Sequence, residues 1–283
     1  MSWIKEGELN LLERFSANVL KAGPMPKHVA FIMDGNRRFA RKKNMECLKG
    51  HMQGFNKLAE TLRWCKHLNI QEVTVYAFSI ENFKRTKEEV DGLMELARQK
   101  FVKLLEERCF LNVCFSYTSR HEITNAVREM AWGVEEGLLK ASDVSESLLN
   151  ECLYSNNSPN PDLLIRTSGE VRLSDFLLWQ SSHSCIVFQS VLWPEYSFWN
   201  LCEAILRYQL NYKSIQKARD LHREQQTLMQ LESDRACVAE LLQHHGNGKP
   251  ADAQRRQEAL QHYISCREER VQDFLRALKH KRD

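Results

Sequence analysis

Residues 28–38, HVAFIMDGNRR, carry the pattern that is most informative about the fold of this chain. Residues 29–33 form an unbroken apolar run of strand length, which predicts a strand buried on both faces, as in a parallel sheet covered by helices. The run ends directly in Asp34-Gly35-Asn36, followed by Arg37 and Arg38. Because ligands bind at the carboxyl ends of parallel strands, these polar residues mark a candidate binding edge.

Four further apolar runs continue the pattern, at residues 73–78, 111–115, 163–165 and 185–188. Amphipathic helical patterns lie between several of them, and two of these helices open with capping boxes, Thr86 with Glu89 and Ser119 with Glu122. We therefore predict an α/β domain over residues 25–200, in which helices cover both faces of a parallel sheet.

Two flanking segments predict further helices. Residues 1–24 have an amphipathic pattern whose charges nearly cancel, so we expect this helix to dock on the protein's own apolar surface, with a membrane-lying helix as the alternative. Its apolar stripe comprises Ile4, Leu11, Leu12, Phe15 and Val19. Residues 201–283 predict a helical hairpin. Its long apolar seam, at residues 201–221 and 260–278, needs a partner chain or a second copy as cover.

The composition excludes several classes of protein. With 283 residues, 43% hydrophobic and 27% charged, the chain is neither disordered nor low in complexity. Its 40 Lys and Arg against 37 Asp and Glu leave a net charge of +3, too little to indicate a nucleic-acid partner. The nine cysteines are scattered without CxxC spacing, which favours reduced thiols over disulfides or a zinc site. With no membrane-spanning run and no signal-peptide pattern, we expect the chain to face the cytosol.

Polar clusters follow three of the predicted strands. Asp34 offers a carboxylate suited to magnesium, and Arg37 and Arg38 offer donors suited to phosphate oxygens. The other two clusters are residues 79–85 and 166–174. Each alone has simpler explanations, such as a helix cap, a solvated basic helix or loop polarity. Together they predict two anion pockets on one sheet edge, as in an enzyme that joins two diphosphates.

These motifs, in this order, resemble those of the cis-prenyltransferases, the undecaprenyl diphosphate synthase-like family. The resemblance covers nearly the whole chain and rests on residues 28–38, Gly50-His51, residues 76–85 and residues 162–180. It implies the parallel-sheet fold of that family. It also implies repeated condensation of isopentenyl diphosphate onto farnesyl diphosphate, with new double bonds in cis. In eukaryotic members the long polyprenyl (dehydrodolichyl) diphosphate serves dolichol synthesis and protein glycosylation.

The resemblance also implies roles for individual residues. Asp34 holds Mg²⁺ on the allylic diphosphate, which Gly35, Arg37 and Arg38 grip. The positions that hold isopentenyl diphosphate are Arg85, Arg166, Arg172 and Ser174. Ser79 and Asn82 orient the leaving group or assist proton removal, and His51 is a further catalytic position. The apolar stripe at residues 90–105 is a candidate wall for the product tunnel, with core packing as the alternative.

Three departures from the family pattern stand out. Cys47 replaces an arginine, so one anion contact is expected to be absent or moved. Cys185 stands where bacterial relatives carry a metal-binding glutamate, which leaves Asp34 as the expected metal carboxylate. The C-terminal Arg-x-Gly motif of bacterial homodimers is also missing. Its absence implies a Nogo-B receptor-type non-catalytic subunit as partner, and peripheral attachment to the cytosolic face of the endoplasmic reticulum membrane through product and partner.

The junction near residues 104–110 lacks the residues that usually turn a helix into a strand. Only Arg108 and Cys109 separate the helical pattern from the apolar run, with no Gly, Pro, Asn or Asp. The resemblance implies that a strand and a helix, roughly 35 residues or one βαβ unit, are absent here. We expect their loss to unpair neighbouring strands and open the tunnel wall. The alternative function is therefore a non-catalytic, splice-type variant that binds the partner without turnover.

Overall fold

The computed structural model describes residues 9–104, 110–245 and 253–282, which form two compact units. Unit 1 comprises Met1–Ser119 and Pro159–Gln216, and unit 2 comprises Arg120–Ser158 and Lys217–Asp283. This division differs from the predicted segments 1–24, 25–200 and 201–283. The reason is that the helices following the third strand pack against the C-terminal helix, as described below.

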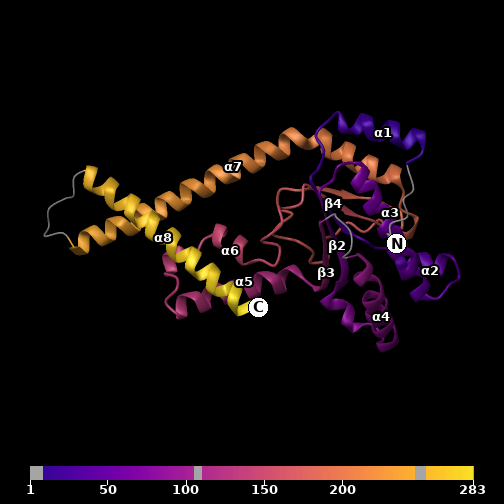
Figure 1. The fold of residues 1–283 in the computed structure, drawn as a ribbon, viewed down its shortest axis with the longest axis horizontal. Helices are drawn as coiled ribbons and strands as arrows, with labels where there is room; N and C mark the ends of the chain where they lie inside the picture. The colour runs from indigo at the N-terminus through magenta and orange to yellow at the C-terminus, as the bar shows by residue number, and fades with distance from the viewer. Residues whose placement is uncertain (1–8, 105–109, 246–252, 283) are drawn as a thin grey trace. The chain divides into compact units, whose positions relative to one another are not determined.

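Unit 1 contains the predicted parallel sheet (Figure 1). Its strands are β1 (His28–Ile32), β2 (Glu72–Ser79), β3 (Phe110–Tyr117), β4 (Leu163–Arg166) and β5 (Cys185–Phe188). Their order is β3-β2-β1-β4-β5, and every neighbouring pair is parallel. All five residues of β1 are buried, as the unbroken apolar run predicts. The predicted α/β fold class is confirmed.

The two faces of the sheet receive different cover within unit 1. Val29 and Phe31 point into a core that contains residues of α1 (Leu11–Lys21), α3 (Cys47–His67) and the start of α7 (Phe198–His245). Ala30 and Ile32 face the other way, toward Phe176 and Leu177. The remaining helices of unit 1 are α2 (Asn36–Lys42), α4 (Lys87–Leu104) and the 3₁₀ helices η1 (Ile80–Lys84) and η3 (Trp193–Glu195).

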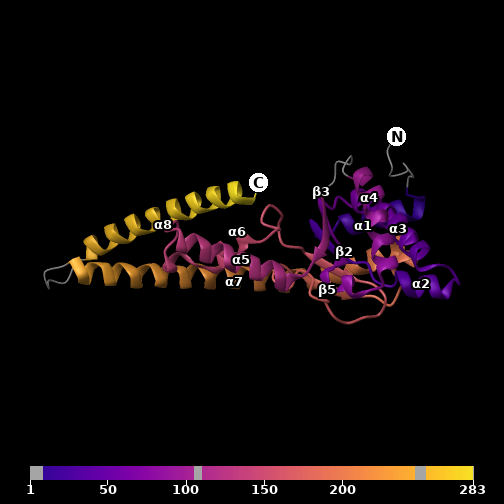
Figure 2. The same cartoon turned by 90° about the horizontal axis from the view of Figure 1, so that it is seen from below.

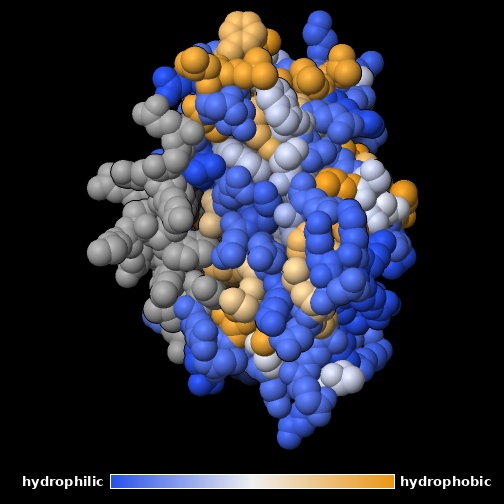
Figure 3. Space-filling view, turned by 90° about the vertical axis from the view of Figure 1, so that its right-hand side faces the viewer, coloured by the Kyte–Doolittle hydropathy of each residue, from blue (hydrophilic) through white to orange (hydrophobic). Residues whose placement is uncertain are grey.

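Helix α1 presents the opposite face from the one predicted. Ala17 and Leu20 are buried, whereas the described members of the predicted inward stripe are exposed by 56–86% of their surface. Those members are Leu11, Leu12, Phe15 and Val19. Hydrophobic side chains gather along the upper edge of the face seen in Figure 3. The correction has a local cause, because Gln209 donates a hydrogen bond to the carbonyl of Leu20 at 2.8 Å and so holds that side of the helix inward.

Unit 2 is helical and contains the predicted hairpin, formed by the later part of α7 and by α8 (Ala253–Arg282). Unit 2 also contains α5 (Ser119–Glu135) and α6 (Glu146–Cys152), and α6 packs against α8 (Figure 2). Phe274 and Leu278 of α8 are buried, and the Phe274 ring lies 6.2 Å from that of Trp132 on α5. The buried Asp143 accepts two hydrogen bonds from Arg270, at 2.9 and 2.7 Å.

The predicted seam is therefore covered largely by the chain itself, which corrects the expectation of an exposed stripe. Its first residues, Leu201 and Ile205, belong to the core of unit 1. Leu260 packs on Val238 within the hairpin. Other apolar residues of α7 remain exposed in unit 2: Leu221, Leu228, Met229 and Leu241. Among the described residues, no helix combines the length and apolarity needed to cross a membrane.

The sheet is continuous across the unusual junction. Residues 105–109 lie outside the described residues, but β2 pairs with β1 on one side and with β3 on the other. The expectation that neighbouring strands lose their partners is thus wrong for β2, since β3 takes the adjacent position. The apolar stripe of α4 is half-buried at each of its described side chains, namely Val90, Leu93, Met94 and Ala97.

Candidate functional site

The carboxyl ends of β1 and β4 bring the first and third predicted clusters together. Ile32 stands in register with Arg166, so Asp34 and Thr167 follow side by side. The Thr167 hydroxyl donates to the carbonyl of Asp34 at 2.8 Å and accepts from the Asp34 N–H at 3.1 Å. Gly35 has a φ of +107°, and a Cβ there would lie 3.1 Å from the Leu192 backbone. This turn therefore requires glycine.

Arg166 is the centre of the site. Its side chain is 4% exposed, and Nη2 donates to Asp34 Oδ2 at 2.9 Å. Nη1 donates to Ser174 Oγ at 2.7 Å and to the carbonyl of Arg172. The Nε of Arg166 is buried and has no hydrogen-bond partner in the described structure. The Arg166 guanidinium thus contacts both predicted anion pockets, and its Nε–H has no acceptor among the described residues.

The carboxylate of Asp34 is held in its charged form. Burial by itself would raise its pKa, but hydrogen bonds from Arg166 and Ser168, together with the charge of Arg166, lower the pKa below its usual range. Arg38 adds a second guanidinium, 3.5 Å from Asp34 Oδ2. Arg38 also donates to the backbone carbonyl and the hydroxyl of Ser168, at 3.0 and 2.5 Å. Two arginines therefore flank one ionised carboxylate.

The loop after β4 adopts strained backbone conformations. Ser168, Ser174, Asp175 and Leu177 all have positive φ values, between 45° and 81°, which cost roughly 1–3 kcal/mol each for residues other than glycine. This loop turns Ser174 toward Arg166. The Arg172 side chain, with 64% of its surface exposed, pairs with Glu170, which also lies 3.6 Å from Arg38. The structure therefore links Ser174 to Asp34 through Arg166, whereas the Arg172 side chain is linked to Asp34 only through Glu170 and Arg38.

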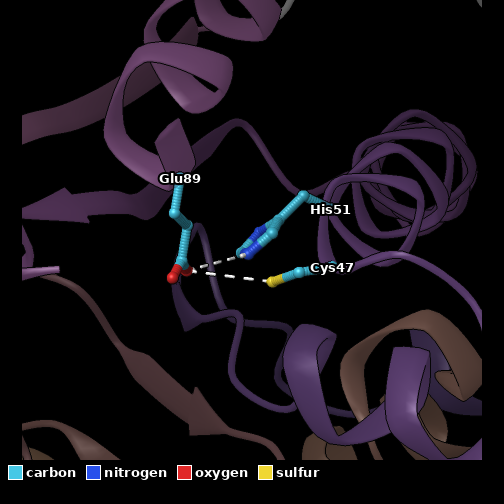
Figure 4. Close-up of side chains that lie close together, drawn as sticks. All are labelled: Cys47, His51 and Glu89. Atoms are coloured by element: carbon cyan, nitrogen blue, oxygen red, sulfur yellow. Dashed lines mark hydrogen bonds and ion pairs between the residues drawn. The ribbon is translucent and has the colours of Figure 1, made fainter. Parts of the chain in front are cut away.

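A second cluster surrounds Glu89, at the start of α4 (Figure 4). Its carboxylate accepts from Arg85 at 2.9 Å and lies 3.9 Å from Arg37. The His51 ring is 3.9 Å away, and the thiol of Cys47 is 3.8 Å away. Burial, reinforced by the charge of Arg85, lowers the pKa of His51 to about 4, so the ring is neutral. Three residues predicted for the site, Arg37, His51 and Arg85, thus lie around Glu89. The sequence analysis assigned Glu89 only to helix capping.

Ser79 and Asn82 cap the 3₁₀ helix η1. Ser79 Oγ accepts from the backbone of Glu81 at 3.2 Å, and Asn82 Oδ1 accepts from the backbone of Ser79 at 3.1 Å. The neighbouring Tyr76 was missed by sequence reasoning. Its hydroxyl donates to the carbonyls of Tyr117, at 3.0 Å, and Ser174, at 3.3 Å. Burial raises the pKa of Tyr76 to about 12, so it remains a donor that fixes the Ser174 loop.

Cys185 lies away from this site. It pairs with Leu163 at the amino end of β5, whereas Arg166 pairs with Phe188 at the carboxyl end. The expectation that Asp34 alone supplies a carboxylate for the metal, with Cys185 in place of the bacterial glutamate, stays a prediction. The parallel register explains where Cys185 lies, since three residues of extended strand separate it from the edge that carries Asp34.

Comparisons with known proteins identify relatives of the whole chain. The family model described as "Putative undecaprenyl diphosphate synthase" matches residues 32–109 and 103–216. Over 100% of this chain, identity is 62% to the dehydrodolichyl diphosphate synthase complex subunit of Mus musculus and 61% to that of Homo sapiens, with 96% of each of those proteins covered. A solved lavandulyl diphosphate synthase from Lavandula x intermedia, in complex with dimethylallyl diphosphate, matches with a TM-score of 0.61 and 28% identity. That match covers 65% of this chain and 95% of the other.

The same comparisons locate the internal gap. The alignment to the mouse relative spans 321 positions whereas this chain has 283 residues, so at least 38 positions have no counterpart here. The two stretches matched by the family model meet at residues 103–109. A gap of at least 38 positions is therefore shown, and the meeting point of the two matched stretches supports its place where the turn residues are absent. That the gap corresponds to one strand and one helix stays a prediction.

Proposed function

This chain belongs to the cis-prenyltransferase family, and we propose that it is the catalytic subunit of a dehydrodolichyl diphosphate synthase. It condenses isopentenyl diphosphate repeatedly onto farnesyl diphosphate and forms each new double bond in cis. The long polyprenyl diphosphate then enters dolichol synthesis and protein glycosylation. The observation that carries the proposal is the pair formed by Asp34 and the buried Arg166, which joins two anion-binding loops at one sheet edge.

Asp34 is the residue that holds Mg²⁺. Its carboxylate is ionised, 32% of its side chain is exposed, and magnesium sites commonly combine one or two carboxylates with substrate phosphates. When bound, the ion stabilises negative charge on the departing diphosphate. Arg38 and Arg37 present guanidinium groups to the allylic diphosphate, and Gly35 lets the backbone turn closely beside it.

The second diphosphate, that of isopentenyl diphosphate, is held by Arg166, Arg172, Ser174 and Arg85. The unpartnered Nε of Arg166 is a buried donor, which supports this assignment because such a group is costly to leave unsatisfied. Arg85 and Arg172 pair with Glu89 and Glu170, and a diphosphate replaces these partners when it binds. Catalysis is then mainly electrostatic, because fixed positive groups stabilise charge on the leaving diphosphate.

Three side chains are assigned to proton handling and leaving-group orientation. His51 is neutral because of its lowered pKa, so its ring can accept a proton or a hydrogen bond. Ser79 and Asn82 are held by reciprocal capping bonds, which fixes the orientation of both side chains beside the second strand end. The half-buried stripe of α4 provides the apolar wall for the growing chain.

The partner is a non-catalytic subunit of the Nogo-B receptor type. Both mammalian relatives are named as subunits of a complex, and the exposed apolar residues of α7, Leu228 and Met229 among them, offer a surface for such a subunit. Product and partner attach the enzyme peripherally to the cytosolic face of the endoplasmic reticulum membrane. Replacing Leu228 and Met229 together by Gln should reduce co-purification with the partner, and undiminished yield would place the interface elsewhere.

The decisive experiment is incorporation of radiolabelled isopentenyl diphosphate by the chain co-expressed with its partner. Labelled long-chain product above the background of an Asp34→Ala variant would support the proposed activity. The 38-position gap favours one competing function, that of a variant which binds the partner without turnover. Stable association with the partner and incorporation no higher than the Asp34→Ala background would establish that alternative.

A further inference from the structure

A set of metal-ligand side chains lies beside the proposed diphosphate site. We propose that Cys47, His51 and Glu89 form a zinc-binding site (Figure 4). Bound zinc would occupy His51 and thereby exclude the proton-handling role proposed above for this ring. The sequence gives no zinc motif because only two of the ligands share a helix. The third comes from α4, which packs against α3.

The geometry suits a tetrahedral ion. Cys47 and His51 are four residues apart on α3 and therefore share one helix face. Glu89 Oε1 is 3.8 Å from the sulfur of Cys47 and 3.9 Å from the Nε2 of His51. Tetrahedral zinc with bonds of about 2.1–2.3 Å places its ligand atoms about 3.4–3.6 Å apart. The two pairs that include Glu89 thus need to approach by only a few tenths of an ångström, and all three ligand atoms lie within 4.8 Å of one another.

The three ligands also have the chemistry that zinc prefers. A thiolate and an imidazole favour zinc over magnesium, which takes oxygen ligands. His51 Nε2 is buried and has no hydrogen-bond partner among the described residues, so this ring nitrogen is available to a ligand. Burial, together with the charge of Arg85, keeps the pKa of His51 low and the ring neutral. Binding would release the Cys47 thiol proton to solvent and leave a fourth position for water.

Two neighbouring arginines limit the affinity. Arg85 donates to Glu89 at 2.9 Å, and Arg37 lies 3.9 Å from the same carboxylate. The positive charges of the two arginines repel a zinc ion, whereas the negative charges of the Cys47 thiolate and the Glu89 carboxylate attract it. Arg85 can keep its bond to Glu89 as an outer-shell donor, as is common for metal-ligating carboxylates. We therefore expect weaker binding than at a closed four-ligand structural site.

The test uses the purified, metal-free full chain and Co²⁺ as a spectroscopic probe. One equivalent of Co²⁺ should produce a thiolate-to-cobalt charge-transfer band, which Zn²⁺ should abolish and excess Mg²⁺ should leave in place. Cys47→Ser should remove the band. Glu89→Gln, which keeps the shape of the side chain and an oxygen acceptor for Arg85, should weaken Co²⁺ binding about tenfold or more, as expected when one of three ligands loses its charge.

The chain offers a matched control. Cys266 on α8 lies 3.7 Å from Nε2 of His262, also four residues away, but no third ligand joins this pair among the described residues. Cys266→Ser should leave the band unchanged. A band that survives Cys47→Ser, disappears in Cys266→Ser, or resists Zn²⁺ would overturn the assignment. Circular dichroism of each variant shows whether the fold is kept, and Glu89→Gln tests the site even if Cys47→Ser is unstable.

Discussion

Removal of the Asp34 carboxylate tests the centre of the site, because Asp34 is the counter-charge of a buried arginine. In Asp34→Ala, Arg166 loses the acceptor at 2.9 Å while remaining almost fully buried. Breaking a buried ion pair costs about 3–5 kcal/mol. Since 32% of the Asp34 side chain is exposed, water can enter the vacated space, and we expect a loss of about 2 kcal/mol in the free energy of unfolding. The catalytic rate should fall roughly a thousandfold or more.

Urea unfolding followed by circular dichroism measures the first effect, and isopentenyl diphosphate incorporation measures the second. Glu170→Ala is the matched stability control, because its arginine partners are 44–64% exposed and such pairs contribute about 1 kcal/mol or less. The double variant Asp34→Ala with Arg166→Met should be less destabilised than the two single losses added together, because it leaves no buried charge unpaired. An Asp34→Ala protein as stable as its parent, and active within a few-fold of it, would refute the reasoning.

Three further predictions concern other parts of the chain. Arg172→Lys should raise the KM for isopentenyl diphosphate more than that for farnesyl diphosphate, and it should leave stability unchanged because this side chain is exposed. Arg166→Lys should have the same effect on KM and should also lower stability, because this side chain is buried. Equal KM changes for both substrates would show that the pockets are misassigned. Inserting the relatives' segment at residues 103–109 should stabilise the chain by several kcal/mol, and equal melting temperatures and turnover of both forms would show that the gap is tolerated. Burial lowers the pKa of His28, so the folded state resists protonation and its free energy of unfolding should fall as the pH drops below about 6.5. Urea unfolding at several pH values should show a smaller fall for His28→Asn than for the parent. Parallel pH profiles of the two proteins would contradict this.

The sheet and the meeting of Asp34 with Arg166 could be predicted from the sequence. An unbroken apolar run such as residues 29–33 has few alternatives to a buried strand, and the carboxyl ends of parallel strands share one edge. The same rule explains Cys185, which is the first residue of the run 185–188 and therefore lies at the amino end of β5, away from that edge.

Two features of the structure could not be predicted from the sequence, for different physical reasons. Glu89 fits a capping pattern, and a residue with one sufficient role in the sequence does not indicate a second one. Arg85, four residues before it, was nevertheless a usable signal for an ion pair. The buried face of α1 was assigned to the larger apolar residues, but the structure buries Ala17 and Leu20. A short helix with apolar residues on two sides does not by itself decide which side packs inward.

The pairing of β2 with both β1 and β3 bears on how this architecture changes length. A strand with its crossover helix carries the chain to the far end of the sheet and back, so a whole strand-helix module can be deleted without reversing the direction of later strands. The 38 positions lacking here are enough for one such module. Loss of a strand alone or of a helix alone would instead reverse the direction of every later strand in the sheet. The strands that carry Asp34 and Arg166 lie on either side of the deletion and keep their direction. The chain can therefore lose such a module without changing how the carboxyl ends of β1 and β4 meet.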